Sequence, residues 1–190
     1  MDISAQKNQL RSAMREAVRA MSEMEMAAQS RAVCERLIGH AAFLKADAVL
    51  FFMPMKDECD LTGAMEAARG MGKRVALPRC EGEYDLGLYV PKSPDCLVKG
   101  RYGILEPDVG RSARISIMDI GFAAIPGVAF DRGCRRLGRG AGYYDRLLQN
   151  AQTTYTAGVG FDCRVVDCVP CSELDVTLSC VMTNKWIFCK

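Results

Sequence analysis

The spacing of apolar and polar positions predicts helices at the start of the chain. Residues 4–21 place polar and basic side chains on one face at helical spacing, which favours a helix with a basic face. The segment Ser22-Glu23-Met24-Glu25 has the form of a capping box, in which a serine and a glutamate three residues later satisfy each other's free backbone N–H groups. A second helix is therefore expected from this box to about residue 43.

Two further helices are expected, over residues 61–71 and 143–150. Asp60 is a suitable N-cap for the first of them, and Gly72 is a suitable stop. Short apolar runs lie between the helices, and the run at 47–53 is long enough for a strand buried on both faces. The predicted strands are 47–53, 73–78, 85–90, 120–125, 154–161 and 176–182.

The alternation of helices and buried strands predicts a three-layer α/β/α fold with a mostly parallel central sheet. We expect a single domain over residues 1–190, because this length suits one hydrophobic core. Ligands of such sheets bind at the carboxyl ends of the strands, so the loops after Met53 and Ile125 should lie near one site. The segment 91–114, rich in proline, glycine and charge, is expected to be a long connection and a candidate functional loop.

Composition and charge narrow the class of protein. Hydrophobic residues make up 49% and charged residues 25% of the chain, which is close to the average of globular proteins. The formal net charge is only +2, so the chain as a whole gives no electrostatic reason to expect a nucleic-acid or membrane partner. No run reaches the roughly 20 apolar residues of a membrane helix, and the N-terminal segment lacks the apolar core of a secretory signal. We therefore expect a cytoplasmic location.

Ten cysteines and one histidine limit the candidate chemistry. The cysteines are irregularly spaced, and most lie in apolar runs, where a free cysteine behaves as a small core residue. The close pair Cys168 and Cys171 could be a redox motif or half of a zinc site, but a zinc site needs a second pair, and His40 is distant in sequence. We expect reduced, structural cysteines, and we expect His40 to cap or pack a helix.

The segment from Pro126 to Arg146 is the most informative part of the chain. Gly138, Gly140 and Gly142 fall at alternate positions, and glycines allow successive backbone N–H groups to converge on an anion. Arginines at 136 and 139 add planar charged donors, and a helix begins close by, around residue 143. This pattern predicts a phosphate site that is neither a Walker A loop nor the dinucleotide fingerprint. The alternative is a flexible surface connection.

Residues 126–146 closely resemble the signature of the 5-formyltetrahydrofolate cyclo-ligase family, with Ala141 at its variable position. The rest of the chain agrees in order and spacing, so the resemblance covers nearly its whole length. The further matching segments are Lys7-Asn-Gln-Leu-Arg11, 53–58, Gly72-Lys73 with Leu77-Pro78-Arg79, Tyr102-Gly-Ile-Leu-Glu-Pro107, and Pro170 with Asp175.

The resemblance implies an enzyme that uses ATP and Mg²⁺ to cyclise 5-formyltetrahydrofolate to 5,10-methenyltetrahydrofolate. In that family ATP activates the N5-formyl oxygen, N10 attacks the resulting formyl phosphate-like intermediate, and ADP and phosphate are released. Such a reaction depends on positioning and charge neutralisation more than on covalent chemistry by the protein. A monomer acting on this small molecule is expected, with no nucleic-acid or membrane partner.

The resemblance also assigns roles to individual residues. Arg139 and Tyr144 are implied nearest the transferring group, and Asp145 and Asp175 as ligands of Mg²⁺. Met53, Glu58, Arg11 and Tyr143 are implied in folate binding. The implied ATP-binding residues are Lys7, Asn8, Gln9, Leu10, Arg11, Arg136, Leu137, Gly138, Arg139, Gly140, Ala141, Gly142, Tyr143 and Tyr144.

Two positions depart from the family pattern: Leu174 stands where members often have histidine, and Arg164 where they often have glutamine. Without the resemblance, Met53 would be read as core and Asp145 as a first-turn acid of a helix. Two other functions remain open. One is a kinase or transferase acting on another phosphorylated substrate, which turnover would separate. The other is an ATP- or RNA-binding module that uses the arginines at 132–146, which salt-dependent affinity would reveal.

Overall fold

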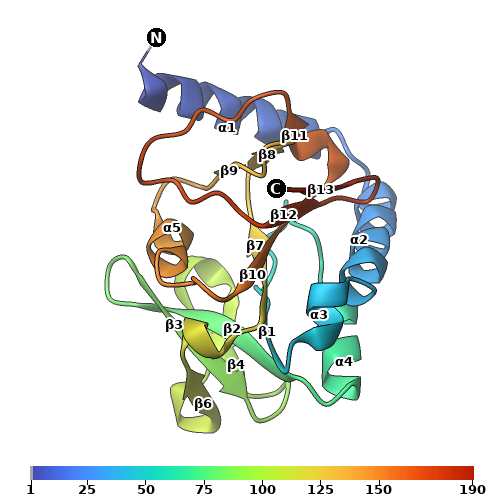
Figure 1. The fold of residues 1–190 in the computed structure, drawn as a ribbon, viewed down its shortest axis with the longest axis vertical. Coiled ribbons are helices and arrows are strands. Elements are labelled where there is room, and N and C mark those ends of the chain that lie inside the picture. The colour runs from blue at the N-terminus through green and yellow to red at the C-terminus, as the bar shows by residue number, and fades with distance from the viewer. Residues whose placement is uncertain (1) are drawn as a thin grey trace.

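An eight-stranded sheet runs through the computed structural model, which describes residues 2–190 (Figure 1). Met1 of the predicted domain lies outside the described residues. The strand order is β13-β12-β10-β7-β1-β2-β3-β6. The strands are β1 (Ala48–Leu50), β2 (Arg74–Glu81), β3 (Asp85–Pro91), β6 (Ser112–Ile115), β7 (Phe122–Pro126), β10 (Tyr155–Val159), β12 (Cys180–Met182) and β13 (Ile187–Cys189).

The centre of the sheet is parallel and its edges are antiparallel. β1 pairs in parallel with β2 and β7, and β10 pairs in parallel with β7 and β12. β13 at one edge, and β3 and β6 at the other, run antiparallel to their neighbours. β3 follows β2 through a short turn in which Gly82 has a positive φ of 63°, so these two strands form a hairpin. The predicted mostly parallel central sheet is confirmed.

Helices cover both faces of this sheet (Figure 1). α2 (Glu23–Ile38), α3 (Ala41–Lys45) and α4 (Thr62–Gly70) lie on one face, and α5 (Tyr143–Leu148) lies on the other. The alternation of side chains along β1 explains the two cores, since Val49 packs in the cluster of Leu37, whereas Leu50 packs in the cluster of Leu148. The predicted three-layer α/β/α architecture is therefore confirmed.

The capping signals act as predicted, but the helix boundaries differ. The Ser22 hydroxyl accepts from the Glu25 N–H, and the Glu25 carboxylate accepts from the Ser22 N–H. The second helix ends at Ile38 instead of continuing to residue 43, because His40 begins α3 and its Nδ1 accepts from a backbone N–H. The Asp60 carboxylate accepts from the Thr62 N–H at the start of α4, although it stands one residue before the N-cap position.

The segment 91–114 is more ordered than the predicted long connection. It contains a small two-stranded sheet, formed by β4 (Leu97–Lys99) and β5 (Leu105–Pro107). Three 3₁₀ turns lie in or next to this region, η1 (Arg101–Gly103), η2 (Val109–Arg111) and η3 (Ile117–Asp119). The Arg79 guanidinium donates to the Pro107 carbonyl, which holds β5 against β2. The apolar residues that lie between the prolines and charged residues of this segment therefore form paired strands.

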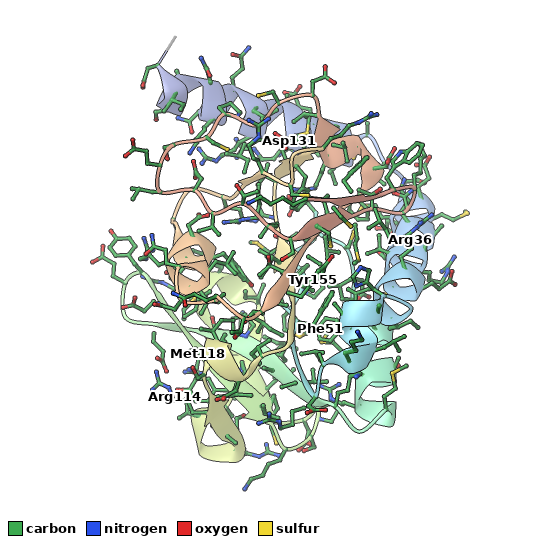
Figure 2. The ribbon with its side chains drawn as sticks, in the orientation of Figure 1. Arg36, Phe51, Arg114, Met118, Asp131 and Tyr155 are labelled. Atoms are coloured by element: carbon green, nitrogen blue, oxygen red, sulfur yellow. The ribbon has the colours of Figure 1, made fainter. Side chains whose placement is uncertain are left out.

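A second small sheet places the first helix at the glycine-rich segment. β8 (Ala129–Asp131) pairs with β9 (Arg136–Leu137) and with β11 (Val165–Val166), which follows the turn η4 (Asp162–Arg164). α1 (Ile3–Arg19) crosses this sheet, and its Leu10 and Met14 pack against Leu137. Asp131 lies beneath α1, and its buried carboxylate accepts from the Val169 N–H (Figure 2). In the part of the chain that the structure describes, no helix is long and apolar enough to cross a membrane.

Candidate active site

A cavity of about 340 Å³ opens where the loops after β1 and β7 meet. Phe52 and Met53 follow β1, and Pro126 and Gly127 end β7, so the predicted meeting of these two loops is confirmed. A mostly apolar wall with few polar groups is typical of small-molecule sites. The lining residues are Phe52, Met53, Met55, Glu58, Pro78, Cys80, Leu86, Tyr102, Ile104, Leu105, Glu106, Pro126, Gly127, Arg136, Gly138, Arg139, Ala141, Gly142, Tyr143, Tyr144 and Asp145.

The glycine-alternating loop adopts a backbone that requires glycine. Gly140 and Gly142 have φ values of 115° and 70°, in the left-handed region that other residues avoid. The Arg146 side chain reaches back to donate to the Ala141 carbonyl at 2.6 Å. The loop is therefore held in one shape by its own following helix, which argues against a merely flexible connection.

The first helix contacts this loop through Arg11. Arg11 Nε donates to the Gly138 carbonyl at 2.9 Å, although 127 residues separate the two in sequence. Asn8 Oδ1 accepts from the same guanidinium at 2.7 Å and thereby orients it. Leu10 packs into the small-sheet core, whereas Gln9 is exposed. Within the Lys7–Arg11 motif, Leu10 anchors the helix and Arg11 contacts the glycine loop.

Arg139 joins the glycine loop to the loop after β1. Its Nε and one terminal nitrogen donate to Glu58 Oε1 at 3.1 and 2.9 Å, and it also forms an ion pair with Asp57. The other Glu58 oxygen accepts from the Met55 N–H. Burial works to raise the pKa of Asp57, but the hydrogen bonds and charges of Arg139 and Arg164 outweigh it and hold that pKa below its usual range. Arg139 and Glu58, for which separate roles are predicted, are thus joined by direct hydrogen bonds.

Arg164, which departs from the family pattern, is a buried anchor of the same loop. Its side chain is only 2% exposed, and it donates to the Gly127 carbonyl at 2.8 Å. It also donates to the backbone carbonyl and the carboxylate of Asp57. Neither residue has a predicted role, although the acidic pair at 57–58 and a lone arginine between apolar residues are visible in the sequence. Leu174, the other departure, is 72% exposed.

Tyr144 at the start of α5 and Arg136 in β9 both line the cavity. Arg136 is buried and donates to Asp145 Oδ1 at 2.7 Å, and its guanidinium lies 5.8 Å from the Tyr144 ring centroid. Burial and the nearby Glu58 carboxylate raise the pKa of Tyr144 well above its usual range. Tyr144 therefore keeps its proton at neutral pH and is a hydrogen-bond donor and not a base. Tyr143 donates to the Glu83 carbonyl at 2.8 Å and accepts from Arg101 at 2.9 Å.

The two predicted magnesium ligands have separate cationic partners. Asp145 lines the cavity and pairs with Arg136, whereas Asp175 Oδ2 accepts from Lys7 Nζ at 2.5 Å and from the Ser172 N–H at 2.6 Å. Burial works to raise the pKa of Asp175, but these partners outweigh it and lower that pKa. Among residues 2–190, no group of three or more acidic, histidine or cysteine side chains could hold a metal ion. Mg²⁺ commonly uses one or two carboxylates with substrate phosphates and water, so each aspartate fits an ion held mainly by phosphate.

Most of the arginines at 132–146 have partners within the protein, although only Arg136 among them is buried. Arg135 pairs with Asp131, and Arg146 donates to the Tyr84 carbonyl, while Arg136 and Arg139 are engaged as described above. Arg132 contacts the Phe188 ring. Because four of these five arginines already have anionic or carbonyl partners, fewer unpaired cations are left for a polynucleotide backbone, which disfavours the RNA-binding alternative. The ten cysteines all lie in the described residues and form no disulfide there.

Glu106 is a cavity residue to which the sequence analysis gave no function. It stands in β5, it is 3% exposed, and it lines the cavity. The Glu-Pro pair at 106–107 was visible as part of a matching turn, but nothing in the sequence indicated that its carboxylate is buried at the cavity.

Comparisons with known proteins show the family of the chain. The model of the "5-formyltetrahydrofolate cyclo-ligase family" matches residues 3–184. The chain is 33% identical over 178 residues to the 5-formyltetrahydrofolate cyclo-ligase of Escherichia coli K12, covering 90% of this chain and 96% of that protein. It is 30% identical over 187 residues to that of Mycolicibacterium smegmatis, covering 94% of each. The solved structure of Aquifex aeolicus 5,10-methenyltetrahydrofolate synthetase superposes with a TM-score of 0.86 at 34% identity, covering 96% of this chain and 92% of that one.

Proposed function

Because the chain belongs to the 5-formyltetrahydrofolate cyclo-ligase family, we propose that it converts 5-formyltetrahydrofolate and ATP to 5,10-methenyltetrahydrofolate, ADP and phosphate. One observation carries the ATP-dependent part of this proposal. Arg139 of the glycine loop is held by Glu58 of the loop after β1, so the proposed phosphate loop and the proposed folate pocket share a wall of the cavity.

The reaction proceeds in two steps. The formyl oxygen forms a bond to the γ-phosphorus, and the bond from that phosphorus to the β–γ bridging oxygen breaks, with the electron pair leaving on ADP. N10 then attacks the activated formyl carbon and loses its proton, and phosphate departs with the former formyl oxygen. Positioning and charge stabilisation suffice for both steps, in keeping with a site without an obvious activated nucleophile.

The glycine loop and the first helix hold the nucleotide in this proposal. Backbone N–H groups at 138–142 face the phosphates, and Lys7 and Arg11 approach them from α1. The docking of Arg11 on the Gly138 carbonyl supports this arrangement. Arg139 stabilises the charge on the transferring phosphoryl group. Its planar guanidinium has several N–H donors, so it can donate to phosphate oxygens while it still donates to Glu58.

The cavity receives the folate. Met53 and its apolar neighbours contact the pterin ring. Tyr143 in the cavity wall and Arg11 on the Gly138 carbonyl lie at the boundary with the nucleotide. Glu58 accepts hydrogen bonds from the substrate and fixes Arg139 at the same time. Tyr144, which stays protonated, donates a hydrogen bond to the oxygen that leaves the formyl carbon.

Asp145 and Asp175 are the residues that we propose to hold Mg²⁺ together with ATP. Bound there, the ion supplies charge neutralisation at the phosphate oxygens. Each aspartate now pairs with a cation, Asp145 with Arg136 and Asp175 with Lys7. A cytoplasmic location and a monomeric state stay predictions.

The test is an assay of the purified protein with 5-formyltetrahydrofolate, ATP and Mg²⁺, followed by methenyl absorbance and ADP release. We expect one ADP for each methenyltetrahydrofolate, and no methenyl product when ATP is left out. A folded protein that binds ATP but forms no methenyl product would instead support the ATP-binding module or a kinase of another substrate.

A further inference from the structure

One carboxylate oxygen in the cavity lacks a partner. Glu106 is 3% exposed, and its Oε1 has no hydrogen bond among residues 2–190. The ion pairs of the described residues do not include Glu106 either. Burying a carboxylate without a donor is strongly unfavourable, so such groups in folded proteins call for a ligand or another explanation.

The surroundings of Glu106 are shaped around its side chain. A Cβ on Gly100 would lie 2.2 Å from Glu106 Cδ and 2.3 Å from its Oε2. Gly100 has a φ of −102°, which any residue adopts, so its backbone does not require glycine. The absence of a side chain at residue 100 therefore makes room for the Glu106 carboxylate.

The neighbour of Glu106 on β2 is the Cys80 thiol, which does not use all the hydrogen-bond acceptor capacity of the Glu106 carboxylate. Burial raises the pKa of Cys80, and the Glu106 charge and a hydrogen bond to it raise it further. Cys80 is thus a protonated, weak donor, which does not satisfy a carboxylate with two oxygens. Glu58 differs, because each of its oxygens already accepts at least one hydrogen bond, from Arg139 or from the Met55 N–H, and only part of its acceptor capacity is left for a substrate. Of these two cavity glutamates, Glu106 has the oxygen without any partner in the described part of the chain.

We propose that Glu106 recognises the substrate by accepting hydrogen bonds from two adjacent N–H donors of a 2-amino-4-oxopyrimidine ring. One edge of this ring carries the 2-amino group and the N3–H side by side. A carboxylate has two oxygens at the matching spacing to accept from both. The proposal rests on the proposed function, whose substrate contains that ring as part of its pterin. Apolar residues next to Glu106 in the cavity wall, including Ile104 and Leu86, then cover the ring.

A purely structural role for Glu106, in which it only fills the space over Gly100, makes a different prediction. If the role is only structural, substitution of Glu106 would weaken the binding of all folates by the same factor. A recognition role instead changes the preference between ligands that differ only at the 2-amino group. The experiment therefore measures a ratio of affinities and not a single affinity.

The probe ligands are 5-formyltetrahydrofolate and its 2-desamino analogue, with affinities from calorimetry. Wild-type protein should bind the analogue about 10- to 100-fold more weakly, since a hydrogen bond to a charged group is lost. Glu106→Met, which keeps the length but removes both acceptors, should bring this ratio to within about threefold of one. The matched control is Glu81→Met, because Glu81 is paired with Arg114 outside the cavity wall and its loss should leave the ratio unchanged.

Gly100→Ala provides a second variant that keeps Glu106 but displaces its carboxylate. It should lower the ligand preference as well, and it should lower it no further in protein that already carries Glu106→Met. If Glu106→Met does not fold, Gly100→Ala makes the same comparison. ATP affinity should stay within about twofold of wild type in each folded variant.

A folded Glu106→Met protein that retains the full preference for the 2-amino ligand would overturn the proposal. So would a wild-type protein that turns over 5-formyltetrahydrofolate but binds the two ligands equally. Failure of the proposed function has another signature, namely no methenyl product from wild-type protein. The two failures are therefore distinguishable.

Discussion

Arg139 donates two hydrogen bonds to a single carboxylate oxygen of Glu58, which lies 81 residues earlier in the chain. One residue belongs to the glycine loop and the other to the loop after the first central strand. The pair means that neither residue is positioned independently, and a change in one should disturb the other. The guanidinium is still 38% exposed, so it is accessible to a ligand in the cavity.

Replacement of Arg139 by alanine should lower turnover far more than folate affinity. Its charge is proposed to act on the phosphoryl group in the transition state, and loss of such a donor costs about 100- to 1,000-fold in kcat. Steady-state kinetics with saturating ATP, beside folate titrations, provide the measurement. Arg132→Ala is the matched control, because Arg132 is exposed and its one side-chain contact among residues 2–190 is with the Phe188 ring. Normal turnover of Arg139→Ala would place the transferring phosphate elsewhere.

Glu58→Gln should weaken 5-formyltetrahydrofolate binding while nucleotide affinity stays nearly unchanged. The amide loses the charge that a substrate N–H group would meet, and hydrogen bonds to charged groups contribute about 1.5–3 kcal/mol. Calorimetric titrations with each ligand measure the two affinities separately. Glu66→Gln on the exposed side of α4 is the control for loss of one charge.

The pairing with Arg139 adds an expectation for the Glu58 variant. The combined Glu58→Gln and Arg139→Ala protein should lose less activity than the two single losses added together, because each already breaks the shared contact. Unchanged folate affinity in Glu58→Gln, or a selective loss of ATP affinity, would remove Glu58 from the folate pocket.

Asp145→Asn and Asp175→Asn should each raise the Mg²⁺ concentration needed for half-maximal activity. Each substitution removes one carboxylate ligand from the proposed Mg²⁺ site. The double variant should lose less activity than the two single losses added together, because either loss already disrupts the shared site. Activity measured across a Mg²⁺ titration gives these values. Asp145→Asn should also lower the free energy of unfolding by up to about 3–5 kcal/mol, because it leaves the buried Arg136 charge without its partner. A Mg²⁺ titration that moves in Asp145→Asn alone would make Asp175 structural.

The lowered pKa of Asp57 predicts how the protein responds to acid. A carboxyl group with a folded pKa below its unfolded value of about 3.9 stabilises the fold above that value. This stability is lost as pH falls through the lowered folded pKa. Arg139→Ala removes one cause of the lowering, so acid unfolding followed by circular dichroism should begin at a higher pH than in wild type. Coincident acid unfolding curves for the two proteins would show that Arg164 alone holds the Asp57 charge.

Local signals in the sequence were sufficient for much of the fold. The capping box at Ser22, the short apolar run of β1 and the glycines with positive φ at 140 and 142 depend on neighbouring residues, so their structures follow from short-range physics. The meeting of the loops after β1 and β7 followed from the rule for parallel strands.

Long-range pairings could not be predicted in the same way. The contact of Arg164 with Asp57 spans 107 residues, and only the folded chain shows that this departure from the family pattern anchors the loop beside Glu58. The 91–114 segment was misjudged, because its prolines and charges hide strands that pair with each other and pack on β2. Glu106 belongs to that segment, so its burial could not be predicted.

The transfer of the formyl oxygen to phosphate is the central claim, and an isotope label tests it most directly. The protein is given ATP, Mg²⁺ and 5-formyltetrahydrofolate labelled with oxygen-18 in the formyl group, and the released phosphate is analysed by mass spectrometry. We predict that each methenyltetrahydrofolate formed yields one phosphate carrying the label. Methenyl product accompanied by unlabelled phosphate, with the label recovered in water, would contradict the phosphorylated intermediate.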